Sequence, residues 1–374
     1  MTVGIDLRCL AEPYGSGVAT YTRRMLTELV ATAPDVRYVV FCSGIKAGRP
    51  QLPQGHIEYR QLRVPNRWLN LSFTLTGHPT IEQCFKAVDI VWQPNPLFIG
   101  TGTIPTWVTV HDLSGSRFPE FFSWHTRWWY QRWVHNFFLR APRHVELIAV
   151  SEHTRRDILA YYPQWRDRVT VLAAPPPGPA AFNDHKRNCV TGKSEPYILA
   201  VMTLEVRKNI GGLLEGFARF HKRAPEFSLK IVGASGYLSR HDLNLLKNLG
   251  AKGIIETVGY VDESVRDELY AHSFCVVYPS FEEGYGYPPL EAFASGRPAV
   301  VAAAGALPEV LRDAPLYIDP YNAATEIAAA LEVLLTDESV YSRCIKRGQD
   351  RLEELRSLFT VQPLIDLWQR RSLV

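Results

Sequence analysis

The stretch PSFEEGYGYPPLEAFASGRP, residues 279–298, places two glutamates, Glu283 and Glu291, eight positions apart across a glycine-bearing turn. It follows the apolar run Val276–Tyr278, which is typical of the end of a buried strand. A strand that leads through a glycine turn into a helix is the repeating unit of a parallel α/β sheet. The stretch therefore predicts an α/β fold with a ligand site at the carboxyl end of this strand.

The residues of the turn indicate which ligand binds there. Gly284 and Gly286 lack a Cβ, so the backbone can approach a ligand closely. Pro288 suits the first position of a helix, and Gly296 suits the left-handed residue just past its end. The helix N-terminus favours a phosphate through its N–H groups and its dipole. Two carboxylates would repel that phosphate, so we expect them to accept hydrogen bonds from hydroxyl groups, and the combination indicates a nucleotide sugar.

The run EGYGYPPLEAFASGRPAV, residues 283–300, resembles the Glu-x7-Glu signature of retaining glycosyltransferases of the large family four, which have the GT-B fold. By this resemblance, Glu291 would hold the nucleotide ribose. Glu283 would bind sugar hydroxyls or stabilise positive charge at the anomeric carbon. An acidic loop before an ordinary core helix is the alternative. The resemblance assigns three further residues to the donor site: Gly286, Tyr287 and Leu290.

The composition describes an ordinary two-domain protein. A chain of 374 residues with 46% hydrophobic and 21% charged residues is long enough for two cores. The net charge of only +3 and the absence of a recognisable zinc or RNA-binding motif in the sequence argue against a nucleic-acid partner. Six scattered cysteines without a C-x-x-C pair favour a reducing compartment. With neither a signal peptide nor an apolar spanning run in the sequence, we expect a cytoplasmic protein, able to reach the cytoplasmic face of the inner membrane.

Apolar runs alternate with helical patterns, which predicts parallel sheets covered on both faces. We expect a GT-B architecture of two Rossmann-like doubly wound domains, 1–178 and 179–356, that face a central cleft. The proline-rich residues 173–180 would link them, and 357–374 would cross back as a helix. Strands are expected at residues 3–7, 38–42, 90–92, 107–110, 147–150, 169–172, 197–201, 229–232, 254–258, 274–278, 299–301 and 316–318. Helices are expected at 18–30, 122–139, 152–161, 210–224, 239–249, 263–272, 290–294 and 324–335.

Two adjacent cations, Arg207 and Lys208, follow a predicted strand in MTLEVRKNI, residues 202–210. Arginine can bind two phosphate oxygens at once, and lysine acts as a point charge, so the pair suits a diphosphate. The run resembles the family segment in which an arginine and a lysine neutralise the leaving diphosphate. Lys208 matches the family lysine, whereas the family arginine falls at Thr203, so we expect Arg207 to substitute. A surface pair at a helix start is the alternative.

Further glycine turns resemble other parts of the family's donor site. The loop at Gly233 resembles the loop beneath the nucleotide base, and the turn that ends at Val261 resembles one whose backbone meets the base edge. In the first domain, the turn of Gly15, Ser16 and Gly17 resembles a loop over the donor phosphate, where N–H groups reach an anion. A plain tight turn is the alternative.

His111 and Asp112 end a predicted strand and resemble the family's His-Asp pair, whose histidine hydrogen-bonds the transferred sugar. A structural histidine is the alternative. Ser151 is predicted to cap the helix that follows it. Since no cluster with metal-ligand spacing stands out, we expect no cofactor and no metal, with cations and N–H dipoles stabilising the leaving diphosphate.

Residues 121–140, FFSWHTRWWYQRWVHNFFLR, hold four of the nine tryptophans together with three arginines and no acid. Tryptophan and arginine on one helix suit the headgroup region of an anionic membrane. They also suit stacking on a sugar acceptor. A helix packed on the sheet with large aromatic side chains is the alternative.

We therefore expect a retaining, metal-independent hexosyltransferase. The whole pattern resembles bacterial mannosyl- and rhamnosyl-type transferases of O-antigen and exopolysaccharide assembly. GDP-mannose is accordingly the first choice of donor, and a lipid-linked oligosaccharide or polysaccharide precursor is the expected acceptor. UDP- or dTDP-sugar donors, an epimerase or phosphorylase of the same fold, and an inert nucleotide-sugar-binding subunit remain alternatives.

Overall fold

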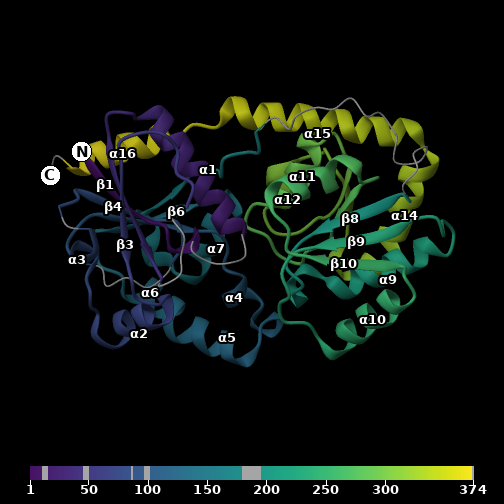
Figure 1. Cartoon of the computed structure of the whole chain (residues 1–374), viewed down its shortest axis with the longest axis horizontal. Helices are drawn as coiled ribbons and strands as arrows, with labels where there is room; N and C mark the ends of the chain where they lie inside the picture. The colour runs from purple at the N-terminus through teal and green to yellow at the C-terminus, as the bar shows by residue number, and fades with distance from the viewer. Residues whose placement is uncertain (11–15, 45–49, 86, 97–101, 179–194, 373–374) are drawn as a thin grey trace. The chain divides into compact units, whose positions relative to one another are not determined.

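The structure is a computed structural model that describes residues 1–10, 16–44, 50–85, 87–96, 102–178 and 195–372 (Figure 1). The chain forms two compact units, each built on its own parallel sheet. Unit 1 comprises Met1–Ser116, Trp128–Pro175 and Phe359–Val374. Unit 2 comprises Arg117–Arg127 and Pro176–Leu358. The predicted fold class, two parallel-sheet α/β domains, is confirmed.

The sheet of unit 1 has the order β3-β2-β1-β4-β5-β6-β7, with every neighbouring pair parallel. This order reverses direction between β1 and β4, which is the kind of position where doubly wound sheets bind ligands. Its strands are β1 (Thr2–Asp6), β2 (Arg37–Ser43), β3 (Ile57–Leu62), β4 (Ile90–Gln93), β5 (Thr106–Val110), β6 (Val145–Ala149) and β7 (Val169–Val171).

Strand β3 is absent from the sequence prediction. It lies at the edge of the sheet and is only half-buried, and it carries Glu58 and Arg60, which form an ion pair at 2.6 Å. Charged side chains on an edge strand discourage pairing with other chains, but they remove the apolar pattern that reveals a strand in the sequence.

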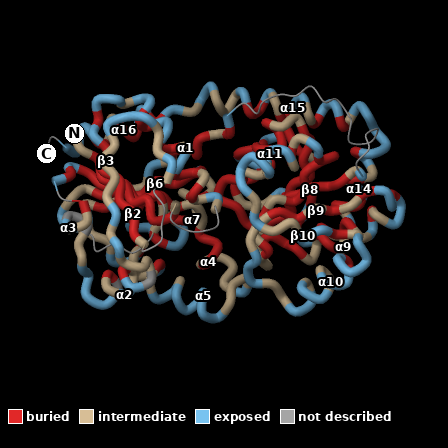
Figure 2. Tube along the Cα trace, in the orientation of Figure 1, coloured by how far each residue is buried: buried red, intermediate tan, exposed pale blue. Residues whose placement is uncertain are grey.

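Unit 1 contains α1 (Gly17–Thr32), α2 (Asn66–Thr76), α3 (Ile81–Phe85), α6 (His135–Arg140), α7 (Glu152–Tyr161) and α16 (Gln362–Ser372). The last helix, α16, packs on the sheet of this unit, where Trp368 meets Trp107 of β5 with ring centroids 6.4 Å apart. Both tryptophans are almost fully buried. Figure 2 shows that buried residues follow the strands in each unit. Residues at the far end of the chain therefore complete the core of unit 1.

The helix predicted at residues 122–139 is confirmed over most of its length, but it is not a regular α-helix. It begins at Trp124 and ends at Arg140, and it runs without a break through α5 (Trp124–Trp129), a π-helical turn (Tyr130–Val134) and α6. It follows α4 (Ser114–Arg117) and a 3₁₀ turn (Pro119–Phe121). The wider π turn accommodates an extra residue, and its Tyr130 ring packs directly on Gly115, where a Cβ would lie only 2.4 Å from the ring. No sequence periodicity signals such a turn.

The sheet of unit 2 has the order β10-β9-β8-β11-β12-β13, again with every neighbouring pair parallel. Its order reverses between β8 and β11. Its strands are β8 (Tyr197–Val201), β9 (Ser228–Val232), β10 (Ile255–Gly259), β11 (Val276–Tyr278), β12 (Ala299–Ala302) and β13 (Leu316–Ile318). Its helices are α9 (Ile210–His221), α10 (Arg240–Ala251), α11 (Glu263–His272), α12 (Tyr287–Ala294), α13 (Leu307–Leu311), α14 (Ala323–Thr336) and α15 (Glu338–Leu358).

Several local predictions are confirmed. The Ser151 hydroxyl caps α7 by accepting from the Thr154 N–H, and Gly296 adopts a left-handed φ of 66° just past α12. Of the cysteines, Cys9, Cys42, Cys275 and Cys344 are buried, Cys84 is half-buried, and Cys189 lies outside the described residues. Over the part of the chain that the structure describes, no helix combines the length and apolar character needed to cross a bilayer.

A substitution at Gly216 can show how tightly α9 packs on α14. A Cβ at this position would lie 2.8 Å from Cβ of Ile327. An alanine there should gain helix propensity yet destabilise the protein by about 1–3 kcal/mol, because the overpacked neighbour must move. Gly250, in α10, provides the matched control, since its Cβ would meet nothing closer than 3.8 Å. Urea unfolding followed by circular dichroism checks both; equal stabilisation by Gly216→Ala and Gly250→Ala would contradict this packing.

Candidate active site

The strongest cluster of predicted site residues lies in unit 2, at the carboxyl ends of β8 and β11. These strands are neighbours at the point where the sheet order reverses. Arg207 and Lys208 follow β8 in a 3₁₀ turn (Val206–Lys208), and Glu283 follows β11. Residues that are 75 positions apart in the sequence thus meet at the edge of the sheet where doubly wound folds bind ligands.

Lys208 and Glu283 form a buried ion pair. The Lys208 ammonium donates to Oε1 of Glu283 at 2.5 Å and to the Tyr278 hydroxyl at 3.0 Å. Only 8% of Lys208 and 7% of Glu283 is exposed. On the other side of the carboxylate, Nη1 of Arg207 lies 3.7 Å from Oε2 of Glu283. Two cations therefore face the Glu283 carboxylate, and Nη2 of Arg207 also lies 3.6 Å from Oε2 of the partly exposed Glu205.

The environment fixes the charge state of this cluster. Burial alone would raise the pKa of Glu283, but Lys208 and Arg207 more than offset that effect and hold it below its usual value. Burial, together with Arg207, lowers the pKa of Lys208, and the contact with Glu283 opposes that shift. Burial and then the negative charge of Glu283 raise the pKa of Tyr278, so its hydroxyl stays protonated. Glu283 is consequently ionised near neutral pH.

Backbone contacts hold residues 281–283, here called the glutamate turn, in place. The Phe281 N–H donates to the Arg207 carbonyl at 3.0 Å, and the Glu283 carbonyl accepts from the Ala306 N–H at 2.8 Å. Nη1 of Arg207 donates to the Glu282 carbonyl at 3.0 Å. Gly305 has a φ of +58°, and a Cβ there would lie 2.5 Å from the Glu283 carbonyl oxygen. Only glycine fits at position 305, because both the φ and the space exclude a side chain.

Glu291 lies in a second cluster of unit 2, between α12 and α11. The Tyr270 hydroxyl donates to its Oε2 at 3.2 Å, and Nη2 of Arg266 lies 3.7 Å from its Oε1. Glu291 is 8% exposed. A carboxylate fixed by a hydroxyl and a guanidinium can still accept hydrogen bonds from hydroxyl groups of a ligand.

The first turn of α12 offers a ligand fewer N–H groups than the sequence suggests. Gly286, with a φ of +96°, is the N-cap, so Tyr287 rather than Pro288 occupies the first helical position. Pro288 and Pro289 have no N–H, which leaves the N–H groups of Gly286 and Tyr287 for an anion. The side chain of Leu290 is fully buried in the core.

The structure places Thr203, Gly233 and Val261 along the loops that follow β8, β9 and β10. Gly233 has a φ of +147°, and a Cβ there would lie 2.0 Å from the Met202 carbonyl oxygen, so no other residue fits. The Gly233 N–H donates to the Gly259 carbonyl at 2.9 Å. Val261 packs against the core cluster beneath these strands. The three predicted residues thus belong to adjacent loops of one sheet edge.

In unit 1, His111 ends β5 with its ring in a defined orientation. Its Nε2 lies 2.8 Å from the Pro94 carbonyl oxygen, and that oxygen can only accept, so Nε2 carries the hydrogen. Burial lowers the pKa of His111, so the ring is neutral and its Nδ1 is an acceptor. The Tyr21 ring contacts the imidazole edge-on, with ring centroids 4.8 Å apart. The ring can therefore accept a hydrogen bond from a hydroxyl group.

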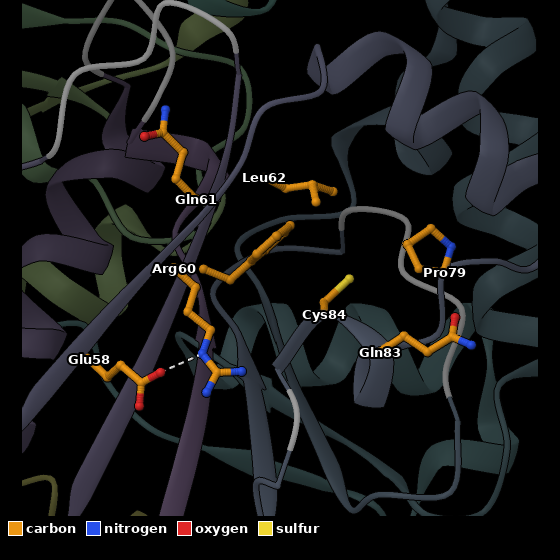
Figure 3. A pocket seen from close by; sticks show the side chains of 8 residues that line it. Glu58, Arg60, Gln61, Leu62, Pro79, Gln83 and Cys84 are labelled. Atoms are coloured by element: carbon orange, nitrogen blue, oxygen red, sulfur yellow. Dashed lines mark hydrogen bonds and ion pairs between the residues drawn. The ribbon is translucent and has the colours of Figure 1, made fainter.

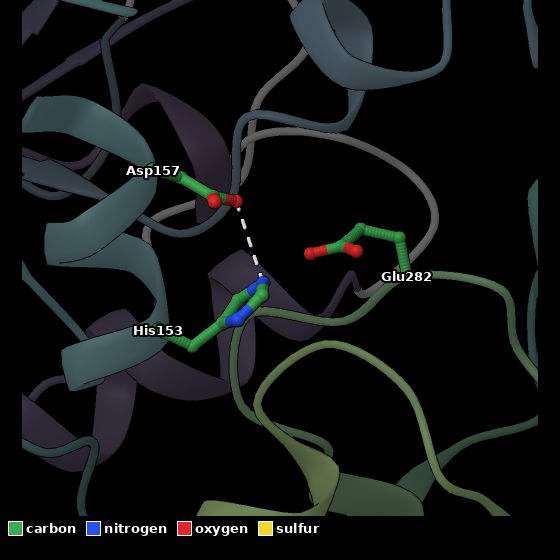
Figure 4. Close-up of side chains that lie close together, drawn as sticks. All are labelled: His153, Asp157 and Glu282. Carbon is green, nitrogen blue, oxygen red and sulfur yellow. Dashed lines mark ion pairs between the residues drawn. The ribbon is translucent and has the colours of Figure 1, made fainter. Parts of the chain in front are cut away.

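Helix α7 supports the same strand end. The Thr154 hydroxyl donates to the His111 carbonyl at 3.1 Å. Figure 4 shows that His153 and Asp157, one turn apart on α7, form an ion pair at 3.3 Å. The Ser16 hydroxyl is occupied as the N-cap of α1, where it accepts from the Ala19 N–H at 3.2 Å. Gly17 begins α1, and Gly15 lies outside the described residues.

Unit 1 also has a separate open hollow of about 510 Å³ beside its edge strand (Figure 3). Its described lining comes from β2, β3 and the region of α3, and includes the Glu58–Arg60 ion pair and Cys84. None of the predicted site residues is among that lining. Burial raises the pKa of the Cys84 thiol to about 11, so the thiol is not an activated nucleophile.

Sequence reasoning missed several residues that contact the two carboxylate clusters: Tyr278, Glu282, Arg117, Tyr270 and Arg266. Glu282 sits directly before Glu283, so adjacent glutamates were a visible signal. Of the others, Tyr278 lies at the end of β11, Tyr270 and Arg266 lie on α11, and Arg117 lies in a segment far from them in the sequence. No local pattern places these residues beside a glutamate, because the contacts arise from sheet order.

Comparisons with known proteins agree on one family. The model described as Glycosyltransferase Family 4 matches residues 15–175, and the model described as Glycosyl transferases group 1 matches residues 182–351. O-antigen chain mannosyltransferase B of Escherichia coli is 30% identical over 247 residues, which is 64% of this chain and 64% of that protein. The chain thus spans slightly less than two thirds of this relative.

Two further similarities cover more of the chain. O-antigen chain mannosyltransferase RfbU of Salmonella typhimurium is 25% identical over 322 residues, which is 82% of this chain and 84% of that protein. Among solved structures, sucrose-phosphate synthase from Thermosynechococcus elongatus has a TM-score of 0.74 at 18% identity and covers 99% of this chain and 98% of its own. At that identity, the structural likeness concerns the fold.

The Lys208–Glu283 pair yields a stability prediction. Lys208→Met leaves a buried carboxylate with only the longer Arg207 contact, so we expect a loss of about 3–5 kcal/mol in the free energy of unfolding near neutral pH. The double variant Lys208→Met/Glu283→Gln should lose less, because no uncompensated charge remains. Urea unfolding of the two variants and the wild type measures this difference; a double variant less stable than Lys208→Met would contradict it.

The same pair fixes the direction of the pH dependence. Because the folded pKa of Glu283 lies below its ordinary value of 4.5, its stabilisation is present above that value and is lost as the pH falls through the folded pKa. In Lys208→Met the pKa of this carboxyl should rise. The stability deficit of the variant should therefore be smaller at a pH of about 4 than at about 7.

Proposed function

Because the chain belongs to glycosyltransferase family 4 with the GT-B fold, we propose that it transfers a hexose from a nucleotide sugar to a saccharide acceptor, with retention of configuration. The observation that carries this proposal is the cluster of Arg207, Lys208 and Glu283 where the order of the unit 2 sheet reverses. GDP-mannose is the proposed donor, because both relatives described above are O-antigen mannosyltransferases.

In the proposed reaction, an acceptor hydroxyl attacks the anomeric carbon on the face from which the diphosphate departs. The bond from that carbon to the phosphate oxygen breaks, and the new glycosidic bond forms. The hydroxyl proton passes to the departing phosphate oxygen, so the products are a glycoside and a nucleoside diphosphate. Negative charge grows on the diphosphate as the bond breaks, and the transition state is stabilised wherever positive charge already points at it.

Arg207 and Lys208 would supply that positive charge, together with the N–H groups of Gly286 and Tyr287. Since two of the first helical residues of α12 are prolines, the two cations carry the larger share of this stabilisation. In this proposal the leaving group requires no metal ion. Glu283, held ionised by its two cations, would stabilise positive charge at the anomeric carbon or bind hydroxyls of the sugar.

The remaining predicted residues would orient the donor. Glu291, fixed by Tyr270 and Arg266, would accept hydrogen bonds from the ribose hydroxyls. The neutral His111 ring would accept a hydrogen bond from a hydroxyl of the transferred sugar through Nδ1, because Nε2 already donates to Pro94. Each of these side chains is fixed by other protein groups before a ligand arrives, which reduces the entropy cost of binding.

We propose a lipid-linked acceptor, reached through contact with an anionic membrane. Trp124 and Trp128 on α5 are 70% and 60% exposed, and Arg132 and Arg140 are exposed beyond them. Buried Val134 and Phe138 anchor the helical stretch to unit 1, so its tryptophans are not part of the core. Helix α2 adds an exposed apolar stripe of Trp68, Leu71 and Leu75, at helical spacing i, i+3, i+7. Exposed tryptophan with nearby arginine suits the headgroup region.

The donor is tested by calorimetric titration of the purified protein with GDP, UDP, dTDP and ADP, first without metal and then with magnesium. We expect GDP to bind most tightly and to need no metal, because Arg207 and Lys208 provide the counter-charge. GDP-mannose should then yield an α-linked product by NMR. A preference for UDP would reject mannose as the donor, and the absence of binding would favour an inert subunit.

A matched pair of variants separates chemistry from binding in that experiment. Glu283→Gln keeps the side-chain shape but removes the charge, so we expect nucleotide affinity within about threefold and turnover reduced by about 10²–10³-fold. Glu332→Gln, at an exposed ion pair with Arg223 in the same unit, is the control and should leave both unchanged. Turnover of Glu283→Gln close to that of the wild type would reject the proposed role.

Membrane contact is tested by sedimentation with liposomes that contain anionic lipid. Each arginine near the surface contributes about 1 kcal/mol, so Arg132→Gln/Arg140→Gln should lower the partition coefficient by about fivefold per charge. Arg343→Gln/Lys346→Gln on α15 removes two exposed charges of unit 2 and is the matched control. Equal losses in both double variants, or no sedimentation of the wild type, would reject this surface.

A further inference from the structure

The segment Arg117–Arg127 has an unusual place in the fold. It lies in the connection between β5 and β6 of unit 1, only five residues after Asp112, yet it clusters with unit 2. Its residues contact the glutamate turn, which lies more than 150 positions later in the sequence. The segment therefore brings side chains from the first half of the chain against the turn that carries Glu283.

The polar contact is an ion pair between Arg117 and Glu282. Nη1 of Arg117 lies 3.1 Å from Oε2 of Glu282, whose side chain is only 2% exposed. Glu282 and Glu283 are consecutive buried carboxylates, and a buried charge that loses its partner is strongly destabilising. Lys208 and Arg207 serve Glu283, while Arg117 serves Glu282. The two neighbouring side chains are thereby directed to different partners.

The apolar contact is a row of aromatic rings. Phe118 stacks on Phe121 at 5.2 Å, and Phe121 stacks on Phe281 at 5.0 Å with an interplanar angle of 27°. Phe281 also contacts the Tyr321 ring at 5.3 Å. The first residue of the glutamate turn is consequently held between a ring of the distant segment and a ring of unit 2. Stacked aromatic pairs resist sliding because the offset geometry is favoured.

We propose that Arg117 and Phe121 are positioning residues for Glu283. They fix Glu282 and Phe281, so that the backbone of the turn delivers the Glu283 carboxylate, rather than that of Glu282, to Lys208. The expected effect on turnover rests on the proposed function, whereas the expected effect on the backbone of the glutamate turn does not. The peptide segment after His111 and Asp112 thereby acquires a second role, in addition to connecting two strands.

The test compares Arg117→Met and Phe121→Leu with the wild type by hydrogen–deuterium exchange and by kinetics. We expect faster exchange of amides at residues 280–286 in both variants, with exchange elsewhere in unit 2 unchanged. Turnover should fall by about tenfold to a hundredfold, since small misplacements of a reacting group cost that much. Nucleotide affinity, measured by titration with GDP, should change by less than about twofold because Arg207, Lys208 and Glu291 are intact.

Three controls make the result specific. Arg223→Met removes an arginine from an exposed ion pair of unit 2 and should change neither exchange nor turnover. Arg117→Met/Glu282→Gln should recover part of the lost turnover, because the carboxylate left without its arginine is neutralised. In a Glu283→Gln background, Arg117→Met should have no further effect on turnover, which a general structural role would not predict.

The possible outcomes separate the two proposals. Unchanged exchange at residues 280–286 in both variants, or turnover losses that simply multiply with Glu283→Gln, would overturn the positioning role. If the wild type transfers no sugar from any donor, the proposed function fails. The exchange data then still decide whether Arg117 and Phe121 hold the glutamate turn.

Discussion

The buried ion pair between Lys208 and Glu283 is the interaction on which the candidate site depends. Two charged groups under one tenth exposed are tolerated only when each compensates the other. Their mutual contact, together with Arg207, keeps the carboxylate ionised, and Arg207 in turn also pairs with Glu205. In the proposed reaction, the two cations would face the diphosphate and Glu283 would face the positive charge that develops at the anomeric carbon. The same pair joins the loops after β8 and β11.

That pairing in turn requires a backbone with very little freedom. Gly305 allows its own backbone to lie against Glu283, and Gly233 allows the loop after β9 to lie against Met202. Two backbone hydrogen bonds fix the glutamate turn at both ends: the Phe281 N–H donates to the Arg207 carbonyl, and the Glu283 carbonyl accepts from the Ala306 N–H. These glycines therefore serve close packing of loops within the protein. The glycine nearest the proposed phosphate site, Gly286, instead starts a helix whose prolines limit its N–H groups.

This arrangement explains why the donor site would depend on side-chain cations. A helix N-terminus with a full set of N–H groups can bind phosphate by itself, but α12 has only two such groups to offer. In the proposed site, Arg207 and Lys208 would compensate for that deficit. The mannosyltransferase relatives support a GDP-sugar donor, and the exposed tryptophans and arginines of α5 and α6 support an acceptor at a membrane surface. The aromatic and ionic contacts of Arg117–Arg127 with the glutamate turn are the basis of the proposed positioning of Glu283.

The sequence by itself determined the alternation of strands and helices, the two sheets and the caps at Ser151 and Gly296, because local periodicity and special residues encode these features. It also singled out Arg207, Lys208 and Glu283 as candidate site residues. It could not reveal strand β3, whose charged edge position hides its pattern, or the π turn at Tyr130. Only the tertiary structure decided that Tyr278 accepts from Lys208, that Arg117 pairs with Glu282 and that Tyr270 holds Glu291. Those contacts depend on strand order and on a segment that joins unit 2, and neither has a local signature in the chain.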